Sequence, residues 1–251
     1  MTWRNQSWEK TDTTLNVSVP PLEFSVDAPL TSTGFTLTGD QYAARLGLEP
    51  DKMYSDEYQA KAVKCKITTT TAARTELNEN ERPETTSLVG SAPLDIQFFS
   101  NPTPNVKNVV WQIYKDGALV LTRTEQNHQY TFTESGNYNV KLQVSNSFCT
   151  DSASLEVKVS ESQIVAPKIF TPNNDGFNDE FRVAYKSIVS FQATIVNRWG
   201  RVLYKWNDPA KGWDGKIGGK PAPEGTYFYI ITAKGSDGKV YPLKGHINLL
   251  R

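Results

Sequence analysis

The sequence of 251 residues is poor in the features that mark most enzymes, metal proteins and membrane proteins. It contains only two cysteines and two histidines, and no apolar run approaches the roughly 20 residues that a membrane-spanning helix needs. Basic and acidic residues number 27 each, which gives a formal net charge of zero. Balanced charge provides no field that would attract nucleic acid or an anionic membrane. We therefore expect no nucleic-acid binding and no membrane span.

Catalytic motifs are also missing. The sequence contains no Gly-x-Ser-x-Gly, no His-Glu-x-x-His and no glycine-rich phosphate loop. His128 lies in a polar stretch and His246 lies near the C-terminus, and neither has a neighbour that would make it a catalytic base or a zinc ligand. The sequence therefore predicts a protein that is not an enzyme, with no catalytic residue, no bound metal and no cofactor.

The two cysteines, Cys65 and Cys149, are too far apart in the sequence to form a CxxC motif. Each lies in or beside a strand-like run, so one disulfide could join neighbouring strands or modules. The alternative is two unpaired thiols that are buried as small hydrophobic residues. The sequence leaves both readings open.

The sequence is rich in short apolar runs that are separated by turn residues. Asp-Gly pairs recur at 116–117, 214–215 and 237–238, and threonine, valine and aromatic residues fill the runs between turns, which is typical of antiparallel β-structure. Helical periodicity is nearly absent. The length suits two or three modules of about 80 to 100 residues. The predicted fold class is therefore all-β, with tandem immunoglobulin-like β-sandwich modules.

Changes in composition divide the chain into three expected parts. Residues 1–82 form an N-terminal β-rich region, residues 83–162 a second module and residues 163–251 a C-terminal module. The polar stretch 75–86 lacks apolar side chains that could join a core, so it reads as a connector. Its acidic residues Glu79 and Glu81 are expected to be solvated.

The second module contains six or seven short alternating strands, which favour an immunoglobulin-like sandwich. Trp111 and Tyr138 are expected in its core. The stretch 90–94, the central Trp111 and the run 136–146 resemble a PKD domain, a sandwich common in bacterial surface proteins. The chain departs from that family after the tryptophan, where the usual Phe-Gly-Asp-Gly is replaced by residues 112–117.

The C-terminal module carries five motifs in order, at 169–181, 195–200, 213–215, 223–229 and 243–251. The turn-forming and bulky residues in them fit a compact sandwich, because glycine and Asx residues form tight turns and large aromatic side chains fill a core. The residues expected in the core or in turns are Trp199, Gly200, Trp213, Asp214, Gly215, Gly225 and Tyr227. Together the five motifs closely resemble the gliding-motility-associated C-terminal domain, the type B sorting domain of the type IX secretion system of Bacteroidetes.

This resemblance implies a role in export. Proteins with this domain cross the inner membrane, and an outer-membrane translocon then recognises the folded domain. We therefore expect a non-catalytic protein that passes through the periplasm and is held at the cell surface or secreted, with the type IX translocon as its partner. Loop and terminal residues are expected to make the contact: Asn173, Asn174, Asp175, Gly176, Asn178, Asp179, Gly245, Asn248, Leu249, Leu250 and Arg251.

Two alternatives accompany this interpretation. The loop 173–179 places oxygen ligands at alternate positions, as a calcium site does, but it lacks the closing glutamate of such a loop, so a structural turn is favoured. The second alternative is an adhesin-like role, in which the N-terminal or PKD-like part binds a surface glycan or a protein and the C-terminal module only delivers it. Exposed aromatic side chains would then form the binding platform, and the candidates are Trp3, Trp8, Tyr54 and Tyr58.

Overall fold

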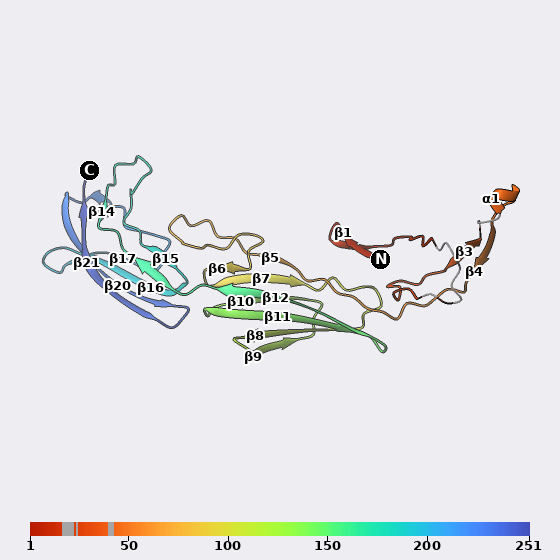
Figure 1. Cartoon of the computed structure of the whole chain (residues 1–251). Coiled ribbons are helices and arrows are strands. Elements are labelled where there is room, and N and C mark those ends of the chain that lie inside the picture. The colour runs from red at the N-terminus through yellow and green to blue at the C-terminus, as the bar shows by residue number, and fades with distance from the viewer. Residues whose placement is uncertain (17–22, 24, 40–42) are drawn as a thin grey trace.

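The computed structural model describes residues 1–16, 23, 25–39 and 43–251. Apart from the four-residue helix α1 (Ala43–Leu46), the regular elements are β-strands. Figure 1 shows an elongated arrangement, with N-terminal hairpins at one end, a β-sandwich in the middle and a second β-sandwich at the other end. The expected all-β class is confirmed. Over the described residues, no helix has the length and hydropathy required to cross a membrane.

The N-terminal region consists of two β-hairpins. One pairs β1 (Thr2–Arg4) with β2 (Ser7–Glu9), and the other pairs β3 (Thr36–Gly39) with β4 (Asp51–Tyr54). Within the described part of the chain before Val63, no hydrophobic side chain is buried. The Trp8 indole donates a hydrogen bond to the Asn101 carbonyl at 2.8 Å, which ties the first hairpin to the second module. Since an isolated hairpin is only marginally stable, such contacts stabilise it.

The second module is a sandwich of two sheets. The first sheet has the order β10-β7-β5 and the second has the order β6-β12-β11-β8-β9. Their bounds are β5 (Thr68–Thr71), β6 (Val89–Gly90), β7 (Leu94–Phe99), β8 (Asn108–Lys115), β9 (Ala118–Arg123), β10 (Asn127–Phe132), β11 (Gly136–Ser145) and β12 (Thr150–Val159). Alternate residues of β7 and β11 point inward, as the two-residue repeat of a strand requires. Trp111 and Tyr138 are buried in this core, as predicted.

The structure differs from the expected module boundary after residue 82. Strand β5 pairs with β7 over four residues, and Val63 and Cys65 belong to the same buried core. We therefore propose that the second module begins near residue 61. The stretch 75–86 looks like a linker in sequence because it is polar, but it connects β5 to β6 of one sandwich. Its Glu79 is buried beside Arg74, so the expectation of a solvated carboxylate is wrong there.

The C-terminal module repeats this strand order. Its main sheet runs β14-β21-β20-β16-β17, and β13 pairs with β15 while β18 pairs with β19. The bounds are β13 (Gln163–Val165), β14 (Ile169–Phe170), β15 (Ala184–Lys186), β16 (Ile188–Val196), β17 (Val202–Trp206), β18 (Lys216–Ile217), β19 (Lys220–Pro221), β20 (Gly225–Gly235) and β21 (Val240–Leu249). In both sandwiches a two-residue edge strand, β6 or β14, pairs in parallel with the last strand of the module, β12 or β21. The two modules therefore share the same strand arrangement in their main sheets.

Both sandwiches also contain a tyrosine corner, in which a strand tyrosine hydrogen-bonds back to the chain just before it. The Tyr138 hydroxyl donates to the Glu134 carbonyl at 2.9 Å, and the Tyr227 hydroxyl donates to the Pro223 carbonyl at 2.8 Å. The glycine two residues before each tyrosine has a positive φ, 145° in the second module and 143° in the C-terminal module. A side chain is disfavoured at such a φ, which explains the shared Gly-x-Tyr pattern.

Candidate functional site

The predicted recognition segments lie at one end of the C-terminal module. Phe170 pairs with Leu249, and Leu249 also pairs with Gly225, so these three residues mark the same end of the main sheet. Val196 leads from this end into the hairpin 197–201. We call the loop 171–180, the hairpin 197–201 and the last two residues the distal end. Figure 1 places the C-terminus at the end of this module away from the second module.

The loop 171–180 is held by its own polar groups. The two carboxylate oxygens of Asp179 accept the backbone N–H groups of Asn174 at 2.6 Å and Gly176 at 2.8 Å. Asp175 accepts the Phe177 N–H at 2.8 Å, and this bond is the main cause that lowers the pKa of the Asp175 carboxyl. The Asp175 bond forms an Asx turn, in which the side chain accepts the N–H two residues on. Of the six predicted loop residues, Asp179 is half-buried. The other five are exposed: Asn173, Asn174, Asp175, Gly176 and Asn178.

The same bonds bear on the calcium alternative. Calcium is bound by several carboxylate and carbonyl oxygens that converge on one point, whereas both Asp179 oxygens and one oxygen of Asp175 already accept backbone N–H groups. Across the described ranges, no three His, Cys, Asp or Glu side chains are grouped as metal ligands would be. The contacts therefore support the structural turn.

Two large aromatic side chains project from the distal end. Phe177 is 77% exposed and Trp199 is 79% exposed. The Asn197 carboxamide fixes the hairpin, because it accepts the N–H groups of Trp199 at 3.0 Å and Arg201 at 2.9 Å. Gly200 has a φ of 79°, as a turn residue should, and of the two expected places for Trp199, core or turn, the structure shows the turn. Phe177 is not among the residues predicted for this surface, although a bulky aromatic residue inside a polar turn indicates an exposed contact residue.

The predicted terminal residues have different environments. Leu249 is buried in the core, and β21 is paired with β14 on one side and β20 on the other, so its backbone is not an open edge. Gly245 lies against Tyr229, whose hydroxyl would be 2.4 Å from an added Cβ atom. Asn248 is half-buried, while Leu250 and Arg251 are exposed. The last two residues are thus the most exposed of the predicted terminal residues.

The remaining predicted residues build the core and turns of this module. Trp213 is fully buried and packs against Phe170 and Tyr227, with ring centroids 5.4 Å and 5.1 Å away. Asp214 accepts the Lys216 N–H at 3.0 Å. The two turn glycines, Gly215 and Gly225, have φ values of 72° and 143°.

Both cysteines are free thiols in the structure. Cys65 is buried, and its backbone N–H donates to Asp151 at 2.9 Å. Burial, followed by the nearby Asp151 carboxylate, raises the pKa of the Cys65 thiol to about 12. Cys149 is half-buried and packs against the same core. The structure therefore agrees with the reading of two unpaired thiols.

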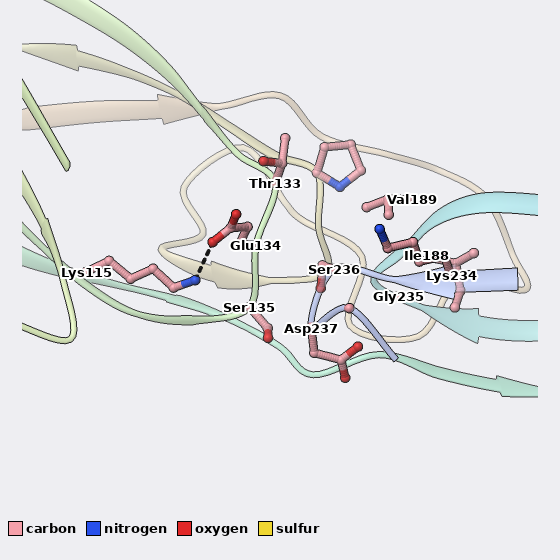
Figure 2. A pocket seen from close by; sticks show the side chains of 12 residues that line it. Lys115, Thr133, Glu134, Ser135, Ile188, Val189, Lys234, Gly235, Ser236 and Asp237 are labelled. Atoms are coloured by element: carbon pink, nitrogen blue, oxygen red, sulfur yellow. Dashed lines mark hydrogen bonds and ion pairs between the residues drawn. The ribbon is translucent and has the colours of Figure 1, made fainter. Parts of the chain in front are cut away.

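A cavity of about 720 Å³ lies where the second and C-terminal modules meet, and Figure 2 shows the side chains that line it. Lys115 pairs with Glu134 at 2.6 Å, and Asp237 accepts hydrogen bonds from the backbone and the hydroxyl of Ser162. The carboxylates of the cavity are thus engaged in structural contacts. The two histidines lie in different modules, His128 in β10 and His246 in β21.

Comparison with known proteins assigns two parts of the chain. Residues 164–249 match the family described as CHU_C, type IX secretion signal domain. Residues 1–55 match the fibronectin type III domain family. No curated protein matches the chain.

Several solved structures are similar to the chain at low identity. The fibronectin(III)-like modules of Clostridium thermocellum CbhA are 14% identical, with 62% of this chain and 84% of that chain covered and a TM-score of 0.23. Domains d3–d4 of rat CD45 are 14% identical, with 63% and 79% covered and a TM-score of 0.26. Three N-terminal domains of the bacteriophage RB49 Hoc protein are 9% identical, with 87% and 78% covered and a TM-score of 0.27. These scores are low, and the assignment rests on the family match over the C-terminal module. That module is a type IX secretion signal domain, and the protein that carries it is exported to the cell surface or secreted.

Proposed function

We propose that the outer-membrane translocon of the type IX system binds the distal end of the secretion signal domain. We also propose that the modules before this domain are non-catalytic. A secretion signal domain implies contact with the secretion machinery. The observation that carries the finer proposal is the pair of exposed aromatic side chains, Phe177 and Trp199, on loops that are fixed by their own hydrogen bonds. Exposed aromatic residues often supply most of the binding energy of an interface.

The rigidity of these loops supports the proposal. Ordering a flexible loop on binding costs about 0.5 to 1.5 kcal/mol for each immobilised side chain. The backbone of the loop 171–180 is already fixed by Asp175 and Asp179. A receptor would therefore meet a preformed surface, and little of its binding energy would be lost in ordering the loops.

The test is export of the full chain in a bacterium with a working type IX system. We expect Phe177→Ser and Trp199→Ser to accumulate in the periplasm, because each removes an exposed contact and leaves the core intact. Phe148→Ser is the matched control, since Phe148 is 69% exposed on the second module. Thermal unfolding of each purified variant checks that it is folded. Normal export of both folded variants, alone and combined, would contradict the proposal.

The terminus is best tested with a short deletion. Removing residues 244–251 would delete more than half of β21 and with it the buried Leu249. Removing only Leu250 and Arg251 keeps the paired strand. We expect this short deletion to reduce export if the last two residues contact the translocon, and full export of the folded deletion variant would limit the recognition surface to the two loops.

The adhesin-like alternative draws some support from the hairpin β3–β4. Both of its strands are exposed throughout, and Tyr54 is 75% exposed. Trp3 and Trp8 do not offer a flat platform, because their rings meet edge to face at 71°. Tyr58 is half-buried. Binding of the full chain to a glycan array, with Tyr54→Ala as the comparison, tests this role.

A further inference from the structure

The second module adds a strand segment to the C-terminal module. The sheet formed by β13 and β15 has only two short strands, and residue 79 lies opposite Tyr185 of β15 in parallel orientation. The Tyr185 N–H donates to the Asn78 carbonyl at 3.0 Å, and the Asn80 N–H donates to the Tyr185 carbonyl at 2.8 Å. Figure 1 shows the segment after β5 reaching toward β15. Pairing of this kind covers an open sheet edge.

The Asn78 side chain extends the contact. Its amide nitrogen donates to the carbonyls of Val183 at 2.7 Å and Pro209 at 2.8 Å, both in the C-terminal module. Backbone carbonyls that are taken out of water need such partners, because an unpaired buried carbonyl costs free energy. One side chain of the second module thus donates hydrogen bonds to carbonyls in two separate segments of the C-terminal module.

Two serines form a reciprocal pair across the junction. Ser91 and Ser187 are both fully buried. The Ser187 N–H donates to the Ser91 hydroxyl at 2.6 Å, and the Ala92 N–H donates to the Ser187 hydroxyl at 2.9 Å. Buried polar groups that are matched in this way fix one relative orientation, since any other orientation would leave them unpaired.

An ion pair lies beside the serines. The Lys186 ammonium is 2.8 Å from a Glu81 carboxylate oxygen. Hydrogen bonding from Lys186 is the main cause that lowers the pKa of Glu81. The junction therefore combines backbone pairing, side-chain amide bonds, buried hydroxyls and charge.

The docking segment is prepared within the second module itself. The Arg74 guanidinium binds both carboxylate oxygens of Glu79, at 2.9 Å and 2.7 Å, and also donates to the Ser91 carbonyl at 2.8 Å. Bidentate arginine–carboxylate pairs are strong and directional. Arg74 thus fixes residues 78–81 and Ser91 in the positions in which they contact the C-terminal module.

We propose that residues 78–81 together with Ser91 form an intermodule clamp that completes the fold of the secretion signal domain. The folded unit then comprises the second and C-terminal modules, beyond the residues 164–249 that match the family. The clamp closes the end of the signal domain opposite the distal end. This inference does not depend on which residues the translocon reads.

Amide hydrogen exchange of the full chain, followed by mass spectrometry, tests the clamp. We expect the peptides that contain 78–82 and 184–188 to be protected together in the unmodified protein. Asn78→Ala removes two hydrogen bonds, and at roughly fivefold for each bond the exchange of both peptides should rise about 25-fold. Exchange within β11 and β20 should stay unchanged. Asn139→Ala, on the exposed face of β11, is the matched control.

Fast exchange of both peptides in the unmodified protein would overturn the proposal. So would an Asn78→Ala variant with unchanged protection at the junction.

A charge exchange provides an independent test that leaves both cores intact. Glu81→Lys alone and Lys186→Glu alone should each raise exchange at the junction, because each places like charges together. The double variant should restore protection. If it exchanges as fast as the single variants while β11 and β20 remain protected, the two modules are not clamped in the observed orientation.

Discussion

Replacing Trp213 and Trp199 by alanine, one at a time, should have very different effects on stability. Trp213 is fully buried among Phe170 and Tyr227, and its indole N–H donates to the Lys216 carbonyl at 2.7 Å. Trp199 is 79% exposed and lies 4.9 Å from the Arg198 guanidinium. The sequence alone does not show that the two tryptophans differ in burial.

The magnitudes follow from these environments. Truncating a buried tryptophan to alanine costs about 3 to 5 kcal/mol. In a folded unit that comprises both sandwiches 1 kcal/mol corresponds to about 2 to 4 °C in Tm, so Trp213→Ala should lower Tm by at least about 6 °C. Trp199→Ala loses an exposed cation–π contact of about 0.5 to 1 kcal/mol, which predicts a decrease of no more than about 4 °C.

Differential scanning calorimetry of the full chain measures both shifts, and hydrogen exchange at β20 amides assigns the transition to the C-terminal module. The expected result is a large shift for Trp213→Ala and a small one for Trp199→Ala. Equal shifts, or a larger shift for Trp199→Ala, would refute the division of the two tryptophans into core and surface.

Three further predictions concern the second module and the junction. Arg74→Ala leaves the Glu79 carboxylate buried without its partner and should destabilise the protein by about 3 to 5 kcal/mol in urea unfolding, whereas replacing both residues by Leu and Met should cost much less; equal losses would contradict this. In the native protein at pH 8, Cys149 should react with iodoacetamide faster than Cys65, whose pKa is about 12, and both should react once unreduced protein is unfolded; no reaction then would indicate a disulfide. Because the pKa of Glu81 is lowered from the ordinary 4.5 in the folded state, its contribution to stability is present above that value and is lost as the pH falls through the lowered pKa. Glu81→Gln should be less sensitive to acid than the unmodified chain, as measured by protection of the junction amides.

Alternation and turn chemistry were sufficient to predict much of the fold. The inward residues of β7 and β11 follow the two-residue repeat, and the glycines at 200, 215 and 225 have the positive φ that their turns require. These features are local, so a sequence pattern reports them directly. The Asn/Asp loop was likewise predictable, because Asx side chains bond to backbone groups two or three residues away.

Features that depend on distant residues were not predictable in this way. The stretch 75–86 is polar in sequence, but the guanidinium of Arg74 and the open edge of β15 give its polar groups partners that no local pattern shows. Leu249 was grouped with the recognition residues because it is close to the terminus, although the last strand is enclosed by two neighbours. The sequence does not decide between core and turn for Trp199, because aromatic residues usually are buried, whereas the hairpin 197–201 leaves this side chain exposed.

The tyrosine corner, present in both adjacent sandwiches, limits how export machinery could select its cargo. A receptor that gripped this corner or the sheet beside it would find two equivalent targets in each chain, Tyr138 with its glycine in one and Tyr227 with its glycine in the other. Such a receptor could bind the wrong module and stall. We therefore infer that discrimination comes from segments that only one of the two sandwiches possesses, such as the loop 171–180 and the hairpin 197–201, while the shared strands and corners only support those segments.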